Sequence, residues 1–255
     1  MPEPPIVTEA IWVILAGVAA GFLNSVVGAG TLVTYPVLLA IGLPPMQANV
    51  TSAVGIFPGS LSAALSYRGV LSQARALIPP TLIGMIAGIA LGIPLLLALP
   101  PGVFSLIVPW LILAAGALTL AQPYLIGRLK SGQTQERHRP WVMAAGLVLA
   151  GAYLAYFGAA TGIITISVLL FAATRDIQVA NALKNLATGI GNGLVAVAFL
   201  ALAEVQVSYA LMIAVGSVVG GAIGGRLAQR LSPRIFRIIV AVIAVGAAIA
   251  AFVAS

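Results

Sequence analysis

Charged residues are scarce in this sequence. Asp, Glu, Lys and Arg together make up 7% of its 255 residues, whereas a soluble domain carries about 25%. Because so few charges cannot keep the surface of a folded chain polar, the composition excludes an ordinary soluble protein. Hydrophobic residues make up 61% of the chain, and the mean hydropathy is +1.15. The apolar segments are long and do not alternate as barrel strands do, so the sequence predicts an all-α polytopic membrane protein.

Cysteine is absent, and acidic residues are missing from the apolar segments. Without cysteine, a disulfide framework and a thiol redox site are excluded. A cation cage or a carboxylate proton relay needs acidic groups inside the membrane. The single histidine, His138, lies in a basic loop, so no metal cluster or nucleophile–base set can be assembled. We therefore expect no metal, no cofactor and no enzyme. The five acidic residues lie in termini or breaks: Glu3, Glu9, Glu136, Asp176 and Glu204.

The net charge of +7 comes from basic residues in the short polar breaks between apolar segments. This placement is the positive-inside pattern of cytoplasmic loops rather than a basic face with interleaved aromatic residues. We therefore expect a protein of the cell membrane without a nucleic-acid partner. The basic residues in or beside these breaks are Arg68, Arg75, Arg128, Lys130, Arg137, Arg139, Arg175, Arg226, Arg230, Arg234 and Arg237.

Two of the ten expected helical elements are short, and they decide the topology. At 1.5 Å per residue, residues 31–41 and 163–173 each span about half a bilayer. If each continued the element before it, the arginines at 226–237 would lie outside. If the chain reverses at the glycine-rich break before each, every basic loop is cytoplasmic and both termini lie outside. The elements are 10–27, 31–41, 47–66, 76–98, 103–123, 141–157, 163–173, 178–203, 207–228 and 234–254.

Residues separated by 132 positions often match, which indicates an internal duplication. Asn49 matches Asn181, and the ladder Gly84, Gly88 and Gly92 matches Gly216, Gly220 and Gly224. Five elements in each half is an odd number, so the two repeats have inverted topology. We expect a first repeat at 1–125, a basic cytoplasmic linker at 126–140 and a second repeat at 141–255. The glycine ladders are typical of close helix packing.

The stretch GFLNSVVGAGTLVTYP, residues 21–36, breaks the chain between two apolar runs, and Gly158–Gly162 is its counterpart. Non-helical backbone is tolerated at membrane depth only where it is buried in protein or lines a wet cavity. Two broken or re-entrant hairpins entering from opposite sides can meet near the midplane, where helix N-termini favour an anion. The alternative is that the glycines only permit tight packing. The site residues expected here are Asn24, Gly28, Gly30, Thr31, Gly158, Thr161 and Gly162.

Two polar clusters follow the short elements, in QANVTSAVGIFPGS (47–60) and VANALKNLATGIGNG (179–193). Their amide, hydroxyl and ammonium groups are all donors, which fits a small oxyanion with several acceptor oxygens. Two other interpretations stay open: the asparagines are N-caps, and Lys184 snorkels to the interface. Otherwise an inward-facing Lys184 would offset the charge of a bound anion. The candidate residues are Asn49, Thr51, Ser52, Asn181, Lys184 and Asn185.

The segments VVGAGTLVTYPVLL and ANVTSAVGIFPGSLSAALSYR, with YFGAATGIITISVLL and ANALKNLATGIGNG in the second half, resemble the sulfite exporter TauE/SafE family. PPGVFSLIVPWLILAAGALTLAQPYL and GGRLAQRLSPRIFR also resemble it, so the match covers nearly the whole chain. The glycine tips, Asn49, Thr51, Ser52, Asn181 and Lys184 stand at motif positions. Two departures are the AAT of the second break and Leu183/Lys184 in place of Thr-Ser.

This resemblance implies a transporter of small sulfur-containing anions, sulfite or organosulfonates, acting as an exporter. We expect a secondary transporter that alternates access around a site between inverted halves. An uncoupled anion channel or facilitator, and a membrane scaffold subunit without a substrate, are the alternatives. The expected partners are the small anion and the lipid bilayer, and a homo-oligomer is left open.

Overall fold

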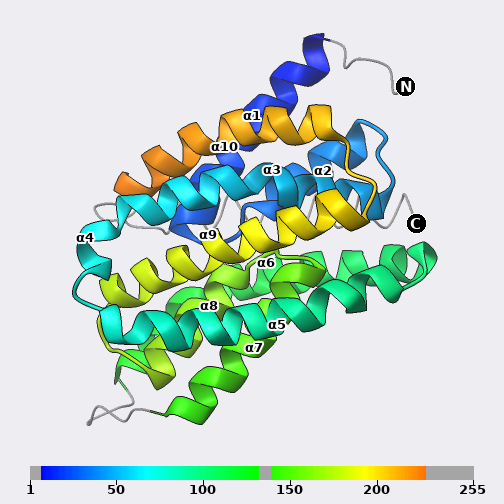
Figure 1. Cartoon of the computed structure of the whole chain (residues 1–255). Helices are drawn as coiled ribbons and strands as arrows, with labels where there is room; N and C mark the ends of the chain where they lie inside the picture. Colours follow the sequence, from blue (N-terminus) through cyan, green and yellow to red (C-terminus); the bar gives the residue numbers. More distant parts are fainter. Residues whose placement is uncertain (1–6, 132–138, 228–255) are drawn as a thin grey trace.

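The computed structural model describes residues 7–131 and 139–227, and throughout this part of the chain every regular element is a helix (Figure 1). The long helices run roughly side by side through the bundle, joined by short turns. In chain order the elements are α1 (Val7–Val26), α2 (Thr31–Ala40), α3 (Pro45–Ser66), α4 (Arg68–Leu71), the 3-10 helix η1 (Arg75–Leu77), α5 (Ile78–Ala98), α6 (Pro101–Ser131), α7 (Pro140–Tyr156), α8 (Thr161–Ala172), α9 (Ile177–Leu202) and α10 (Val207–Leu227).

Nine of the ten expected elements correspond to these helices, and the all-α fold is confirmed. One boundary was wrong: α6 ends at Ser131 rather than near residue 123, because Leu125, Arg128, Leu129 and Lys130 are good helix formers that outweigh Gly127. It therefore runs into the segment expected to be the linker. The tenth element, 234–254, lies outside the described residues. So do the expected Arg137, His138, Arg230, Arg234 and Arg237, and Glu3 and Glu136.

Five helices in the described part are long and apolar enough to cross a membrane. They are α1, α5 with η1, α6, α9 and α10, and their apolar windows cover Glu9–Val26, Arg75–Ala98, Gly102–Arg128, Ile177–Leu202 and Val207–Leu227. The helix α3 has 22 residues and is of similar length. It is more polar, and its polar residues Asn49, Thr51, Ser52 and Ser60 are buried in the bundle.

The chain reverses direction at both glycine-rich breaks, as the topology argument requires. At the second break, α8 returns along α7, and the N–H of Arg139 before α7 donates to the carbonyl of Ala172 at the end of α8 (3.0 Å). At the first break, α2 turns back on α1, so that a Cβ on Gly30 would lie 2.7 Å from the carbonyl oxygen of Ala20. Each short helix therefore forms a hairpin with the helix before it.

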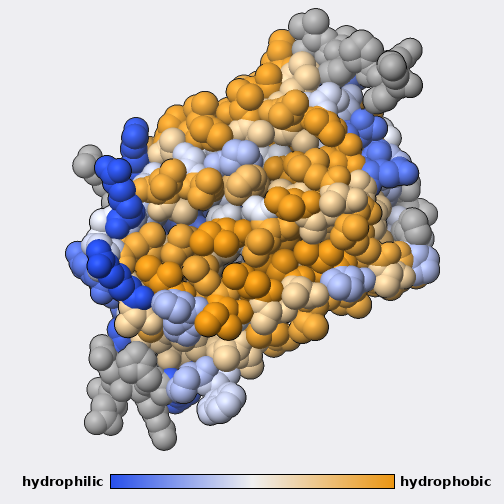
Figure 2. Space-filling model, viewed as in Figure 1, coloured by the Kyte–Doolittle hydropathy of each residue, from blue (hydrophilic) through white to orange (hydrophobic). Residues whose placement is uncertain are grey.

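Apart from Lys184, the basic residues of the three described polar breaks gather at one end of the bundle. Gly225, next to Arg226, packs against Ser66, close to Arg68, and the bond between Arg139 and Ala172 brings two further basic segments together. Figure 2 shows a hydrophobic band across the bundle with the most hydrophilic residues at its left end, beside α4. At the other end, the Tyr209 hydroxyl donates to Glu9 (3.0 Å). The common end of the three basic breaks agrees with the reversed topology.

The two glycine ladders pack helices closely, as predicted. A Cβ on Gly88 of α5 would overlap the carbonyl oxygen of Val148 on α7. In the same way, a Cβ on Gly220 of α10 would overlap the carbonyl oxygen of Val18 on α1. The ladder of each half therefore packs against the first helix of the other half. The inverted orientation of the two repeats, and their boundaries, stay predictions.

Candidate functional site

The two chain breaks touch each other inside the bundle. The N–H of Gly162 donates to the carbonyl of Gly28 at 3.4 Å. A Cβ on Gly28 would overlap the Cα of Gly162, and a Cβ on Gly162 would lie 2.5 Å from the Cα of Gly28. Gly28 also has a positive φ of 83°, which favours glycine. Only a pair of glycines permits this approach of two backbones.

Each break ends the preceding helix in the same way. The N–H groups of Val27 and Gly28 both donate to the carbonyl of Leu23, at 2.8 and 3.0 Å, and those of Phe157 and Gly158 both donate to Tyr153, at 3.0 and 2.9 Å. Gly158 has a φ of 76°, as expected for a left-handed residue closing a helix. Gly28 and Gly158 are thus conformational counterparts, although they are 130 positions apart. Because α8 has 12 residues and α2 has 10, the residues that follow these two short helices are again 132 positions apart.

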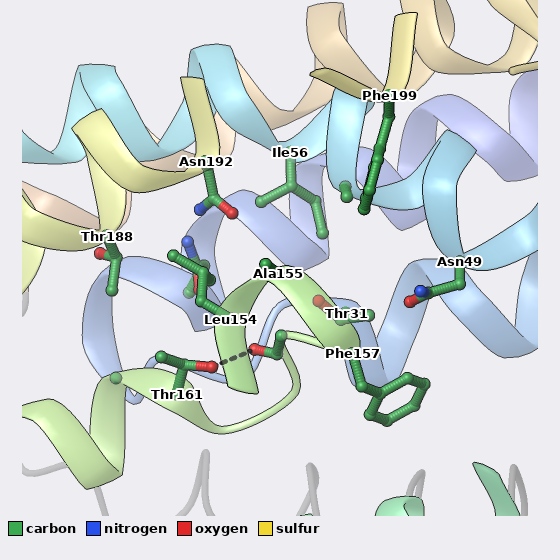
Figure 3. A pocket seen from close by; sticks show the side chains of 14 residues that line it. Thr31, Asn49, Ile56, Leu154, Ala155, Phe157, Thr161, Thr188, Asn192 and Phe199 are labelled. Carbon is green, nitrogen blue, oxygen red and sulfur yellow. Dashed lines mark hydrogen bonds between the residues drawn. The ribbon is translucent and has the colours of Figure 1, made fainter. Parts of the chain in front are cut away.

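A small cavity lies against the contact between the breaks (Figure 3). Its volume is about 10 Å³, close to the room that one water molecule needs, so an oxyanion does not fit without movement of the walls. No charged side chain is among its lining residues. The lining residues are Asn24, Thr31, Asn49, Ala53, Ile56, Leu154, Ala155, Phe157, Gly158, Thr161, Gly162, Thr188, Asn192 and Phe199.

The amides in this cavity are held by hydrogen bonds between helices. The amide nitrogens of Asn24 on α1 and Asn192 on α9 donate to the hydroxyl of Ser60 on α3, at 2.8 and 3.0 Å. The amide of Asn49 on α3 donates to the backbone carbonyl of Tyr156 beside the second break, at 3.1 Å. The cavity thus brings together polar groups from both halves of the chain.

The threonines that begin the two short helices differ in their bonding. The N–H and the hydroxyl of Thr161 both donate to the carbonyl of Gly158, at 3.4 and 3.0 Å. Among the described residues, neither the N–H nor the hydroxyl of Thr31 has a hydrogen-bond partner, and its side chain is 9% exposed. Figure 3 shows Thr31 among the residues around the cavity. Thr31 therefore offers two donors at the positive end of α2.

Several predicted site residues have partners elsewhere and do not line the cavity. Thr51 accepts from the N–H of Gln206 (3.1 Å) and Ser52 bonds the hydroxyl of Thr34. Asn185 donates to the carbonyl of Asn181 (3.1 Å). Gly28 and Gly30 belong to the first break but do not line the cavity. Of the predicted residues, those that line the cavity are Asn24, Thr31, Asn49, Gly158, Thr161 and Gly162.

Asn181 lies near the basic end, where its amide donates to the hydroxyl of Tyr67 at 3.0 Å. Burial raises the pKa of Tyr67 to about 12, so this hydroxyl stays protonated at neutral pH. The N-cap interpretation of the asparagines is wrong. Pro44 is the N-cap of α3, and Asp176 is the N-cap of α9, where its carboxylate accepts from Gln178 at 2.7 Å.

Lys184 is buried, with 1% of its surface exposed, so the snorkelling interpretation is wrong. Its ammonium donates to the carbonyl of Ser25 in the last turn of α1, at 3.0 Å, a favourable place for a cation. The side chain passes behind Gly162: a Cβ there would lie 3.2 Å from the lysine Cδ. No carboxylate in the described part of the chain pairs with Lys184. The amino group of Lys184 is thus buried next to the cavity wall and is not a direct part of it.

Sequence reasoning missed Thr188 and Asn192, two polar residues of the cavity. Both follow Lys184 at steps of four residues, which places them on the same face of α9. This helical spacing was a usable signal. The spacing of 132 residues also relates Asn192 to Ser60, and the structure shows that these two residues are hydrogen-bonded to each other.

Throughout the described residues, these features define an all-helical membrane protein whose two broken hairpins meet beside a buried polar cavity. A family model described as "Sulfite exporter TauE/SafE" matches residues 13–251. The chain belongs to this family.

Three relatives are named as transporters. A "Probable membrane transporter protein" of Haemophilus influenzae is 32% identical over 57% of this chain and 56% of its own. "Probable membrane transporter protein ORF9" of Sinorhizobium is 34% identical over 58% and 56%, and "Probable membrane transporter protein YfcA" of Escherichia coli K12 is 30% identical over 56% and 52%. The chain thus spans about half the length of the curated relatives it matches. No solved structure matches this chain.

Proposed function

We propose that this protein is a secondary transporter of small sulfur-containing anions, sulfite or organosulfonates, and that it exports them by alternating access. The observation that carries the proposal is Lys184, whose ammonium is buried behind the cavity wall without a carboxylate partner in the described chain. Burying an ammonium without a compensating charge costs about 5 kcal/mol. An anion in the cavity would supply the missing negative charge.

The cavity itself supports an anionic rather than a cationic ligand. Amide and hydroxyl groups of Asn24, Thr31, Asn49 and Asn192 are donors, and no acidic residue is present to hold a cation. The two free donors of Thr31 lie at the positive end of α2. The family's description, sulfite exporter, supports the choice of a sulfur oxyanion.

Transport requires the cavity to open in turn to each side, because it is too small for an oxyanion in this conformation. The contact between Gly28 and Gly162 joins the hairpins of the two halves next to the cavity, so opening requires the hairpins to move against each other there. In this proposal the end of the bundle with the basic residues faces the cytoplasm. Substrate binding also involves the predicted residues behind the cavity, with Lys184 acting through its charge.

Two measurements on the full chain test this function. In proteoliposomes loaded with unlabelled sulfite, uptake of labelled sulfite should be stimulated by the internal sulfite, whereas a channel gives no such trans-stimulation. In detergent, thermal stabilisation by sulfite, thiosulfate, sulfoacetate, taurine and sulfate identifies the preferred anion. Absence of stabilisation by every anion, together with absence of uptake, would favour a scaffold subunit. Asn49→Ala should weaken this stabilisation more than its matched variant Asn181→Ala, since of these two residues only Asn49 lines the cavity.

A further inference from the structure

One hydroxyl group joins three helices beside the cavity. Ser60 Oγ on α3 accepts hydrogen bonds from the amides of Asn24 and Asn192, at 2.8 and 3.0 Å. It donates its own proton to the carbonyl of Ile56 at 3.1 Å. A hydroxyl has one donor and two acceptor sites, so Ser60 uses its full capacity. Asn24 and Asn192 line the cavity, whereas Ser60 stands behind them.

The amides of Asn24 and Asn192 therefore donate to the same oxygen atom, which belongs to the protein and not to a bound anion. Convergent N–H donors at these distances are also the arrangement that binds an oxygen of an oxyanion. Hydrogen bonds to a charged oxygen are about twice as strong as those to a neutral one. An anion in the cavity would thus attract both amides away from the serine, which would keep its bond to Ile56.

We propose that Ser60 Oγ is an internal competitor of the substrate: it occupies the two amide N–H groups of Asn24 and Asn192 that an oxygen of the anion takes when it binds. This inference rests on the proposed function and deepens it, because it makes Ser60 an affinity-determining residue that does not itself contact the anion. With the amides on Ser60, the cavity is closed. Binding turns both amides inward and releases the contact of α3 with α1 and α9.

The position of Ser60 links this exchange to movement between the halves. Ser60 and Asn192 are 132 positions apart, the spacing of the internal repeat, and their bond joins α3 of the first half to α9 of the second. When the anion takes the Asn192 amide, this direct bond between the halves is lost. Occupation of the site thereby loosens one of the ties that hold the closed conformation.

The test is anaerobic calorimetric titration of the purified full-length protein with sulfite. Without its hydroxyl, Ser60→Ala no longer competes, and it should bind sulfite about tenfold more tightly than the wild type, since two bonds are lost that each contribute a factor of about three. Ser60→Thr keeps the hydroxyl and should bind as the wild type does. Ser62→Ala is the matched control on the same helix, because its hydroxyl contacts only the carbonyl of Val218 (3.4 Å).

A purely structural role for Ser60 predicts the opposite result. In that case Ser60→Ala would bind sulfite no more tightly than the wild type, and the inference would be wrong while wild-type binding still supported the proposed function. The gain should also disappear when Asn24 and Asn192 are both replaced by Ala, since no amide is left to be freed. If Ser60→Ala does not fold, Ser60→Cys replaces it, because a thiol is a weak acceptor. Absence of binding by the wild type and every variant would overturn both proposals.

Discussion

The threonines that begin the two short helices lie at equivalent positions but differ in their hydrogen bonds. Thr161 directs its N–H and its hydroxyl to the carbonyl of Gly158, and so closes the second break on itself. Thr31 leaves both groups without a partner in the described chain, next to the same cavity. The two breaks therefore have the same backbone shape but different hydrogen bonding. The donors of Thr161 bond within the second break, whereas those of Thr31 at the first break have no partner in the described chain.

The same asymmetry holds behind the cavity. Ser52 and Lys184 are 132 positions apart, yet Ser52 makes a neutral bond to Thr34 while Lys184 brings a buried charge to the carbonyl of Ser25. If the predicted repeats are true copies, one position of this pair has an ionisable side chain and the other does not. A ligand between such halves meets two unequal walls.

The largest effect is expected from breaking the contact shared by the two breaks. Gly28→Ala adds a Cβ that overlaps the Cα of Gly162 and forces a positive φ of 83° on alanine. Together these should destabilise the protein by about 3 kcal/mol, from overpacking and left-handed strain. Gly42→Ala is the control: its φ is 99°, but no atom lies within 4 Å of the added Cβ. Melting temperatures in detergent compare the two, and equal shifts would show that the contact contributes nothing.

Removing the buried charge sharpens the comparison between Ser52 and Lys184. Lys184→Met should leave the ligand-free protein as stable as the wild type or more stable, because burying the ammonium costs more than its one hydrogen bond returns. Sulfite affinity should fall about tenfold or more, as expected for loss of a nearby charge in a low-dielectric interior. Melting curves with and without sulfite measure both effects. Lys184→Arg keeps the charge and serves as the control, and unchanged affinity in Lys184→Met would contradict the role given to the ammonium.

Exchanging each threonine for valine separates the two breaks directly. Thr31→Val removes a donor to the anion, so sulfite affinity should fall about tenfold or more, as expected for loss of one hydrogen bond to a charged group, with little change in melting temperature. Thr161→Val removes the bond to Gly158 and should lower stability by about 1 kcal/mol. Thermal stabilisation across a sulfite titration reports both quantities. The comparison fails if the two variants lose affinity and stability in the same proportions.

The smallest effect is expected at Tyr35 on α2, whose ring packs edge-on against Phe157 of the second break with centroids 5.5 Å apart. Its buried hydroxyl has no hydrogen-bond partner among the residues that the structure describes. Tyr35→Phe should therefore change stability by less than about 0.5 kcal/mol, or increase it slightly. Tyr67→Phe, which removes the acceptor of the Asn181 amide, should cost about 1 kcal/mol. A large loss in Tyr35→Phe alone would mean that its hydroxyl has a partner in the membrane.

Much of the fold could be predicted because its signals are local. Runs of apolar residues gave nine helices to within a few residues, apart from the end of α6, and glycine marked where the chain reverses. The positive-inside rule then selected the reversing topology, since charge placement depends only on which loops share a side. The candidate site was predictable only in part. Asn24, Thr31 and Asn49 line the cavity as expected, but Thr188 and Asn192 do so as well.

The sequence by itself determined where most of the long helices begin and end, and that two breaks would need glycine, because these properties depend on neighbouring residues and on the solvent around each segment. Tertiary structure alone decided which partners polar groups reach on other helices. Helical periodicity shows which face a side chain shares, but not which of several nearby acceptors it reaches. In the folded structure the Lys184 amino group bonds a carbonyl of α1, and the amides of Asn24 and Asn192 bond Ser60. The donors of Thr31 have no partner among the described residues.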